Sequence, residues 1–150
     1  MGSSSRAGIR VGAISIDFLV DADDSGGSVT VFECVVPADA KVPVPHSHDA
    51  FEETIYGLEG VSTWSIDGEP RELAPGDSVC IRRGQIHGFV NRGSVEAKFL
   101  AIATPGVFGP AYFQDIARVL AATAGGPPDL AAIGEVMRHH GLTPAPPAAG

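Results

Sequence analysis

The chain has 150 residues, of which 44% are hydrophobic and 19% charged, a balance typical of one globular domain. Its net charge is −8 and its ten basic residues form no run longer than Arg82-Arg83, which argues against a nucleic-acid partner. Residues 1–15 contain no apolar run long enough for a signal peptide or a membrane span, so we expect a cytoplasmic protein without a membrane partner.

The first two thirds of the chain read as β structure. Residues 1–10 are expected to be a disordered N-terminus, and residues 11–104 a β barrel. Residues 14–20 alternate between apolar and polar side chains, and residues 29–36 are nearly apolar on both faces. Residues 21–28 between them form a polar, glycine-rich turn.

Two turn signals predict hairpins within the β region. Asp67-Gly68 favours a tight turn between two strands, and Gly84 lies between two further apolar strands. About eight to ten short strands joined by such frequent turns indicate a sandwich or a barrel.

The pattern changes after Pro105, and residues 105–150 predict a helical extension with a tail. One helix carries apolar side chains at helical spacing, namely Tyr112, Phe113, Ile116, Val119 and Leu120. A second helix is expected over residues 127–140, with Gly141 as its cap. We expect both helices to pack against the outside of the barrel, and residues 142–150 to be frayed.

Cys34 and Cys80 lie in apolar stretches, and neither has a partner at the spacing of a metal site. We therefore expect two buried, reduced thiols, in keeping with a cytosolic protein. Thiolate chemistry at Cys80 would need a positive neighbour, for which Arg82 is a candidate.

The stretch PVPHSHDAFEETIYGLEG contains two histidines, His46 and His48, that are two residues apart. On an extended chain both imidazoles point to the same face, which places two nitrogen donors side by side. Glu53 follows His48 at an odd offset, so the chain must bulge or turn within residues 49–52 to bring its carboxylate back. Glu52 must then point the other way, and we interpret it as an exposed charge.

His87 adds a third imidazole in an apolar β context. Each histidine taken alone reads as an ordinary core or rim residue. An unpaired imidazole in a core is costly, however, and a metal or a hydrogen-bond partner removes that cost. The spacing of the whole set therefore predicts a metal site.

Two motifs of the cupin superfamily resemble this sequence. The first, HxHx4Ex6G, is matched by His46, His48, Glu53 and Gly60. The second, Gx5PxGx2Hx3N, is similar to the chain at Gly76, Gly84, His87 and Asn91. Two turn positions depart from the motifs, since Ala40 stands in place of a glycine and Arg82 in place of the proline. The resemblance implies an all-β fold, the double-stranded β-helix or jelly-roll barrel, in a small single-domain bacterial cupin.

Carried over residue by residue, the resemblance makes His46, His48, Glu53 and His87 ligands of one divalent transition metal ion. Three imidazoles and one carboxylate suit Fe, Mn, Ni, Co or Zn and leave two octahedral positions for substrate or dioxygen. The motifs are most similar to those of quercetin-dioxygenase-like cupins. That similarity implies an oxygenase acting on a small organic molecule, with Glu53 also serving as general base.

Two other functions stay open. The first is a non-redox isomerase, cyclase or lyase that uses the ion as a Lewis acid. The second is a non-catalytic module that binds a small molecule or a metal. Sensing cupins are commonly joined to a DNA-binding domain, but the two C-terminal helices here have no basic recognition face.

Several other residues carry weaker predictions. Candidate substrate-binding residues are the aromatic side chains expected to line the barrel: Tyr56, Trp64, Phe89 and Phe99. A purely structural role in the core is the alternative for each of them. We expect Asn91 to hold a turn or to bond to a neighbour of the ligands, and we interpret His139 and His140 as structural. The strand at residues 14–20 suits pairing through its edge, so we expect a homodimer.

Overall fold

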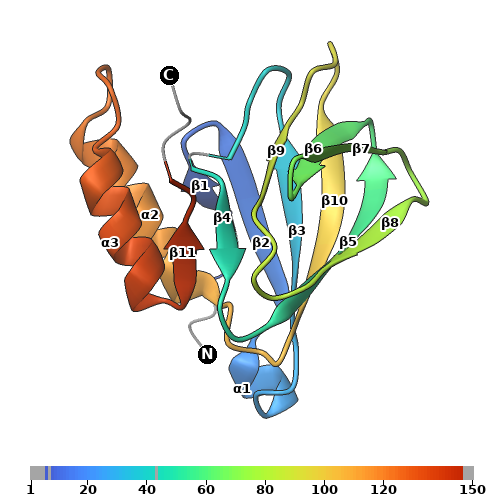
Figure 1. Ribbon diagram of the computed structural model, residues 1–150, viewed down its shortest axis with the longest axis horizontal. Coiled ribbons are helices and arrows are strands. Elements are labelled where there is room, and N and C mark those ends of the chain that lie inside the picture. The colour runs from blue at the N-terminus through green and yellow to red at the C-terminus, as the bar shows by residue number, and fades with distance from the viewer. Residues whose placement is uncertain (1–5, 7, 43, 147–150) are drawn as a thin grey trace.

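In the computed structural model, which describes residues 6, 8–42 and 44–146, the strands form two antiparallel sheets that face each other (Figure 1). The six-stranded sheet has the order β1-β2-β3-β10-β5-β8, with the bounds Ile9–Val11, Ile14–Val20, Thr30–Val36, Ala97–Thr104, Glu52–Glu59 and Ser78–Ile81. The five-stranded sheet has the order β11-β4-β9-β6-β7, with the bounds Leu142–Pro144, His46–His48, His87–Val90, Ser62–Ile66 and Glu69–Leu73. This arrangement confirms the prediction of an all-β jelly-roll fold with two C-terminal helices.

The core lies between the two sheets because their strands alternate. In β2, Ile14, Ile16 and Phe18 point inward and are buried, as their spacing predicts. β3 alternates in the same way, with its outward positions only partly buried, although its sequence is nearly apolar on both faces. Removal of these inward side chains from water is the main favourable term in folding, at about 25 cal/mol per Å² of apolar surface.

The two predicted turns have different outcomes. Asp67 and Gly68 have φ angles of 49° and 83° and join β6 to β7, so the first hairpin is confirmed. The hairpin predicted around Gly84 is wrong, because β8 pairs with β5 in one sheet while β9 pairs with β4 and β6 in the other. The turn at Gly84, with a φ of 84°, passes the chain from sheet to sheet.

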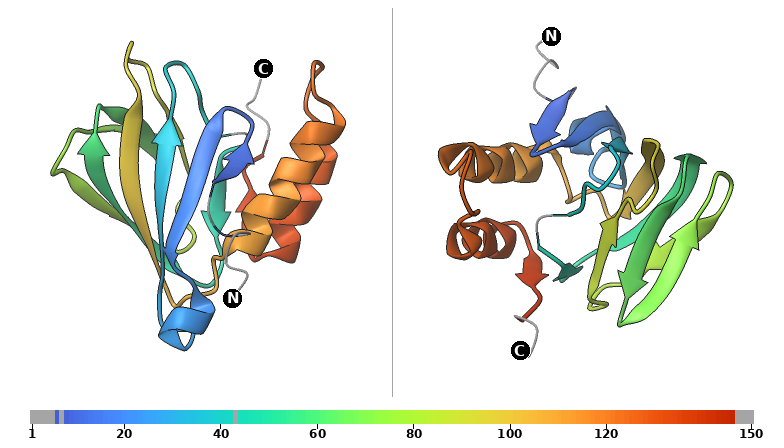
Figure 2. Two further views of the ribbon diagram at one scale, coloured as in Figure 1. Left: turned by 180° about the vertical axis from the view of Figure 1, so that it is seen from behind. Right: turned by 90° about the horizontal axis from the view of Figure 1, so that it is seen from above.

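Two helices close one side of the sandwich (Figure 2). α2 (Pro110–Ala122) contacts β1, and α3 (Leu130–His139) contacts β11, so the pair covers the gap between these outer strands of the two sheets. The sequence predicts both helices on the outside of the barrel. α2 lies there, and its buried residues Tyr112 and Ile116 also face the interior cavity through the open side of the sandwich.

The N-terminal region is more ordered than predicted. Ile9 and Arg10 belong to β1, which pairs with β2, so disorder over the whole of residues 1–10 is wrong; residues 1–5 and 7 lie outside the described residues. β1 covers the edge of β2 that the sequence offers for pairing between subunits. The route expected for a homodimer is therefore used within the chain, and the homodimer itself stays a prediction.

The C-terminal region is also more ordered than predicted. A frayed tail from residue 142 is wrong, because β11 forms there and pairs with β4. Leu142 lies opposite His48, and Pro144 lies opposite His46. The short strand that carries two histidines is therefore held between β9 and β11.

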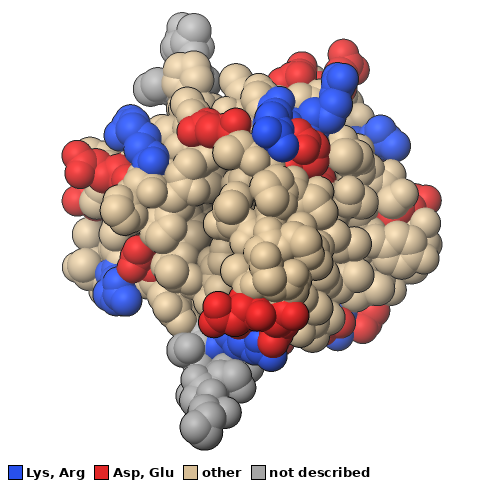
Figure 3. Space-filling view, turned by 90° about the horizontal axis from the view of Figure 1, so that it is seen from below, with Lys and Arg blue, Asp and Glu red and all other residues tan. Residues whose placement is uncertain are grey.

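Charged side chains are scattered over the surface. On the face seen from below they surround a broad uncharged area, and the described Lys and Arg side chains there form no continuous stripe (Figure 3).

α1 (Ala22–Ser25), a single helical turn, lies within the predicted polar turn and is capped by Asp21, whose Oδ1 accepts from the backbone N–H of Asp24 at 3.1 Å. None of the described helices is long and apolar enough to cross a membrane.

Leu142→Ala is expected to lower the free energy of unfolding by about 2–5 kcal/mol, because the Leu142 side chain is fully buried. Leu130→Ala is the matched control. Leu130 is 60% exposed, so its loss should change the free energy of unfolding by less than about 0.5 kcal/mol. Urea unfolding followed by circular dichroism measures both variants. Equal effects would mean that β11 is not part of the folded core.

Candidate metal centre

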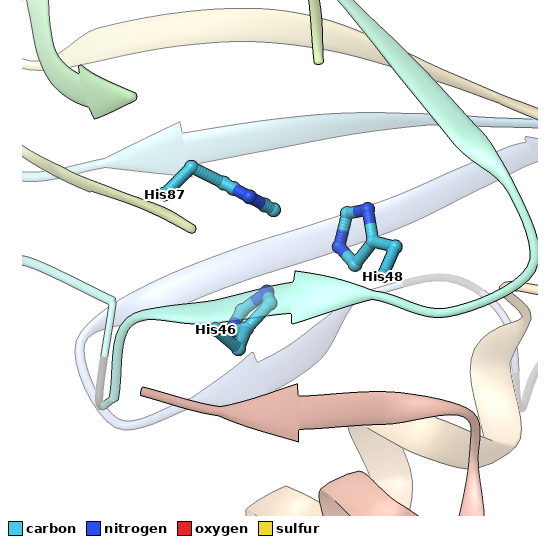
Figure 4. A group of neighbouring side chains, drawn as sticks. All are labelled: His46, His48 and His87. Carbon is cyan, nitrogen blue, oxygen red and sulfur yellow. The ribbon is translucent and has the colours of Figure 1, made fainter. Parts of the chain in front are cut away.

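Three histidines converge between the sheets (Figure 4). His46 and His48 lie at the two ends of β4 with their rings on one face, as their spacing predicts, and His87 begins β9 directly opposite His46. All three side chains are buried. Each ring offers one nitrogen, and these nitrogens all lie within 4.8 Å of one another. The three rings could therefore bind one metal ion.

Backbone carbonyls fix the orientation of two of the rings. The Nδ1–H of His46 donates to the carbonyl oxygen of Val44 at 2.9 Å, and the Nδ1–H of His87 donates to that of Gln85 at 2.9 Å. Because a carbonyl oxygen only accepts, each Nδ1 must carry the ring proton, which leaves a free lone pair on Nε2. Hydrogen bonds of this kind orient metal-binding histidines in proteins.

His48 is the polar side chain that most needs a partner. Neither of its ring nitrogens has a hydrogen bond within the described part of the chain. The ring stacks on Phe51, with centroids 4.2 Å apart and planes 18° from parallel, so its position is fixed. A buried imidazole left unpaired costs about 1–3 kcal/mol, and a bond from one nitrogen to a metal would remove that cost. The residues present therefore fit a metal ion.

Glu53 adds a carboxylate to the cluster. The chain bends at residues 49–51, as the sequence predicts, and this turn brings Glu53 back to the inner face. Its Oε1 lies 3.9 Å from Nε2 of His48 and 3.9 Å from Nε2 of His87. The carboxylate and the three imidazoles could therefore share one ion after small side-chain movements.

Burial keeps the metal-free cluster uncharged. It lowers the pKa of His46 to about 3, helped by the nearby His87, and it also lowers the pKa values of His48 and His87. Burial raises the pKa of Glu53 to about 8. At neutral pH the cluster thus consists of neutral imidazoles and a protonated carboxyl group. A divalent cation would favour the ionised carboxylate, so the donor set suits a cation.

The cluster borders a small, mostly apolar cavity of about 60 Å³. Trp64, Phe89 and Phe99 line this cavity, and their role in binding a substrate stays a prediction. Tyr56 does not line it. Tyr56 is 43% exposed on the outer face of β5, because it lies three residues from the inward-facing Glu53 and an odd offset reverses the direction of a strand side chain.

Some lining residues are ones that the sequence does not assign to the site. They come from β3, from the segment before α2 and from α2 itself: Cys34, Phe108, Tyr112, Phe113 and Ile116. Helical spacing predicts that the last three share one apolar face, but it does not tell which surface that face covers.

Cys34 is buried as predicted. Cys80 is exposed on the outward side of the edge strand β8, which corrects the prediction that both thiols are buried.

Two polar residues near the cluster have structural roles. The Asn91 amide donates to the carbonyl oxygens of Val36 at 2.9 Å and Val95 at 2.8 Å, so it holds the turn after β9, one of its two predicted roles. Glu52 points away from the cluster, as predicted, and accepts from Nη2 of Arg83 at 2.8 Å.

A comparison with known protein families matches the part of the chain that carries these histidines and Glu53. The family model described as a Cupin domain matches residues 32–103, a range that contains the three histidines and Glu53. The chain belongs to the cupin superfamily. This result confirms the resemblance of the two motifs.

Relatives of this cupin have several activities. This chain is 34% identical over 67 residues to the quercetin 2,3-dioxygenase of Bacillus subtilis. The matched region is 45% of this chain and 20% of the enzyme. A similar solved structure is a sugar phosphate isomerase from Silicibacter pomeroyi, with 27% identity over 63% of this chain and 60% of that one and a TM-score of 0.56. Another is the polyketide cyclase RemF from Streptomyces resistomycificus, with 28% identity over 73% of this chain and 82% of that one and a TM-score of 0.55.

This cupin thus spans a fifth of the length of the dioxygenase and less than two thirds of that of the isomerase. The three relatives differ in reaction, and one fold supports many chemistries. Membership of the superfamily therefore does not fix the reaction of this cupin.

In this cupin, His48→Ala and His87→Ala are each expected to abolish stoichiometric binding of a transition metal, because each removes one of only a few donors. Both variants should remain folded and rich in β structure. His139→Ala is the control, since His139 is exposed at the end of α3 and should not affect binding. Elemental analysis after loading and dialysis, with circular dichroism, measures these effects. Unchanged metal content in the double variant would contradict the site.

Metal binding at pH 7 is expected to release about one proton, because the pKa of about 8 keeps Glu53 protonated until a cation binds. The imidazoles contribute none, since their lowered pKa values leave them neutral. The release should fall toward zero above about pH 9, where the carboxyl group is already ionised. Calorimetric titration in buffers of different ionisation enthalpy measures the release. Glu53→Gln should abolish it, and a release that stays constant from pH 7 to about pH 9.5 would contradict this account.

The same raised pKa has a consequence for stability. A carboxyl group that is harder to ionise in the folded state than in the unfolded state stabilises the fold only while it is protonated. The contribution of Glu53 to the stability of the metal-free protein therefore falls as the pH rises from 4.5 to about 8, whereas the contribution of the three imidazoles, whose pKa values are lowered, grows as the pH rises toward 6.5.

Proposed function

We propose that this cupin is a metal-dependent enzyme in which His46, His48, His87 and Glu53 hold one divalent transition metal ion. The observation that carries the proposal is His48, which is fully buried and has no partner among the described residues. Beside it lie two rings whose Nε2 atoms keep a lone pair and a carboxylate 3.9 Å away. Imidazole and carboxylate donors suit Fe, Mn, Ni, Co or Zn. An ion bound there would supply Lewis-acid or redox chemistry to an oxygen atom of the substrate.

The lining of the cavity supports a substrate without strong negative charge. Among the described residues that line it, none is Lys or Arg, and aromatic and aliphatic side chains predominate. A phosphate or dicarboxylate group would lose its hydration there without a compensating basic side chain. A neutral or weakly acidic hydroxyl compound, such as a catechol or an enol, is the better match. Glu53 would accept the proton of that hydroxyl group.

The size of the cavity limits the substrate further. An engineered apolar cavity of about 150 Å³ binds benzene, whereas the cavity here measures about 60 Å³. A ring therefore enters only when a wall moves, and a single-ring compound needs less movement than a three-ring flavonol. α2 is the wall that does not belong to either sheet.

An oxygenase of the quercetin-dioxygenase type is the reaction that we propose. The identity to the Bacillus subtilis enzyme and the aromatic lining support it. A non-redox cyclase is the second candidate, supported by the likeness to the polyketide cyclase over 73% of the chain. The two reactions differ in whether dioxygen is consumed.

Protein purified without oxygen and loaded with Fe, Mn, Ni or Co is expected to consume dioxygen when catechols or flavonols are added, with catechols turned over faster. Zinc-loaded protein should not, because zinc has no redox chemistry. Glu53→Gln should abolish uptake, and Tyr56→Phe, outside the cavity, should not. An oxygen electrode with product analysis measures this. Product formed without oxygen uptake would favour the cyclase, and metal-loaded protein that converts none of the compounds would contradict both enzymes.

A further inference from the structure

The residues matched by the Cupin domain model end at 103, before α2 begins. α2 nevertheless forms one wall of the cavity next to the histidines, to which it contributes Tyr112, Phe113 and Ile116. Figure 2 shows the helix beside β1 and α3, on the open side of the sandwich. The site is therefore completed by a segment that the family motifs do not include.

Tyr112 carries the only alcohol or phenol hydroxyl among the described side chains that line the cavity. Other strong neutral donors there are already engaged. The indole N–H of Trp64 donates to the Ser62 hydroxyl at 2.9 Å, and the Nδ1–H groups of His46 and His87 donate to backbone carbonyls. The Tyr112 hydroxyl has no hydrogen-bond partner within the described part of the chain.

The position of the Tyr112 ring is fixed by its neighbours. Tyr112 is 5% exposed, and its ring centroid lies 5.2 Å from that of Phe108 and 5.6 Å from that of His140. Phe108 in turn lies 5.3 Å from the ring of His48. His140 also pairs through Nε2 with Oδ2 of Asp115 at 2.8 Å, which ties the end of α3 to α2. The phenol is thus held beside the histidine cluster by side chains that flank the two helices, Phe108 before α2 and His140 after α3.

The electrostatic environment keeps this phenol protonated. Burial raises the pKa of Tyr112, and the negative charge of Glu53 raises it further. A protonated phenol in an apolar cavity can only gain by donating its hydrogen to an acceptor that enters.

We propose that the Tyr112 hydroxyl donates a hydrogen bond to an acceptor atom of the ligand held at the metal centre. The inference rests on the proposed metal centre. It names the class of ligand, which is a small molecule with an anionic or strongly accepting atom, such as an ionised hydroxyl oxygen. It also makes α2 a part of the binding site and gives Tyr112 a direct contact with the ligand.

The test uses the full chain loaded with Co²⁺. The probe is azide, a three-atom anion small enough for the cavity. Tyr112→Phe removes one oxygen atom and is expected to weaken azide binding about tenfold, the effect of losing one hydrogen bond to a charged acceptor. Cobalt content and thermal stability should not change. Tyr56→Phe is the matched control, because it removes the same atom from the chain's other tyrosine, outside the cavity. The visible absorption of cobalt during an azide titration measures the affinity.

The outcomes separate the two proposals. If Tyr112→Phe takes up cobalt and binds azide as tightly as the unsubstituted protein, the role of Tyr112 is wrong and the metal centre stands. If the unsubstituted protein takes up no cobalt, the metal centre is wrong and the inference fails with it.

A second measurement does not depend on the folding of a variant at Tyr112. In zinc-loaded protein with 3-fluorotyrosine at both tyrosines, azide should shift the ¹⁹F resonance of residue 112 and leave that of residue 56 in place. The Tyr56→Phe protein assigns the two resonances. An unmoved resonance at residue 112 would overturn the inference.

Discussion

The burial of four ionisable side chains in one small volume is the constraint on which this molecule depends. His46, His48, His87 and Glu53 are all nearly inaccessible to water, and no described Lys or Arg lines the cavity beside them. Such a group can exist only as an uncharged cluster or around a cation, because isolated charges in an apolar interior are too costly. The surrounding fold orients the side chains for the arrangement around a cation. It fixes two rings by backbone carbonyls and the third by an aromatic stack.

The strand that carries two of these histidines is short and depends on its neighbours for its position. β4 has three residues and pairs with β9 only where His46 lies opposite His87. Its other edge is paired with β11 along its whole length. β11 is positioned by α3, α3 packs on α2, and α2 packs on β1. The C-terminal region therefore supports the strand that bears two of the histidines, and it also walls the cavity they face.

The sequence was sufficient for those parts of the site that depend on local spacing. A spacing of two positions from His46 to His48 puts both rings on one face, and the odd offset of Glu53 requires the bend at residues 49–51 that the structure contains. It was insufficient where partners are distant in the chain. An apolar helix face, such as that of α2, does not reveal which surface it covers. The same holds for the segment at residues 142–144, whose three residues carry too little pattern to predict a strand.

The same limit explains two of the errors within the barrel. Two apolar strands around Gly84 look like a hairpin, but the same glycine can carry a chain from one sheet to another. The aromatic ring of Tyr56 suggests a place among the cavity aromatics, but its odd offset from Glu53 puts it on the opposite face of β5. Residue type is thus a weaker guide to a site than strand parity.

The pairing of β4 with β11 sets an order of events during synthesis. Asp49, just after β4, accepts a hydrogen bond from the Thr143 hydroxyl at 2.7 Å, a contact that spans 94 residues of chain. A growing chain that has passed His87 already possesses every proposed ligand. It still lacks the strand that holds β4 in place and the helix that walls the cavity. The proposed ligands therefore reach their native geometry only after residue 144 has emerged from the ribosome.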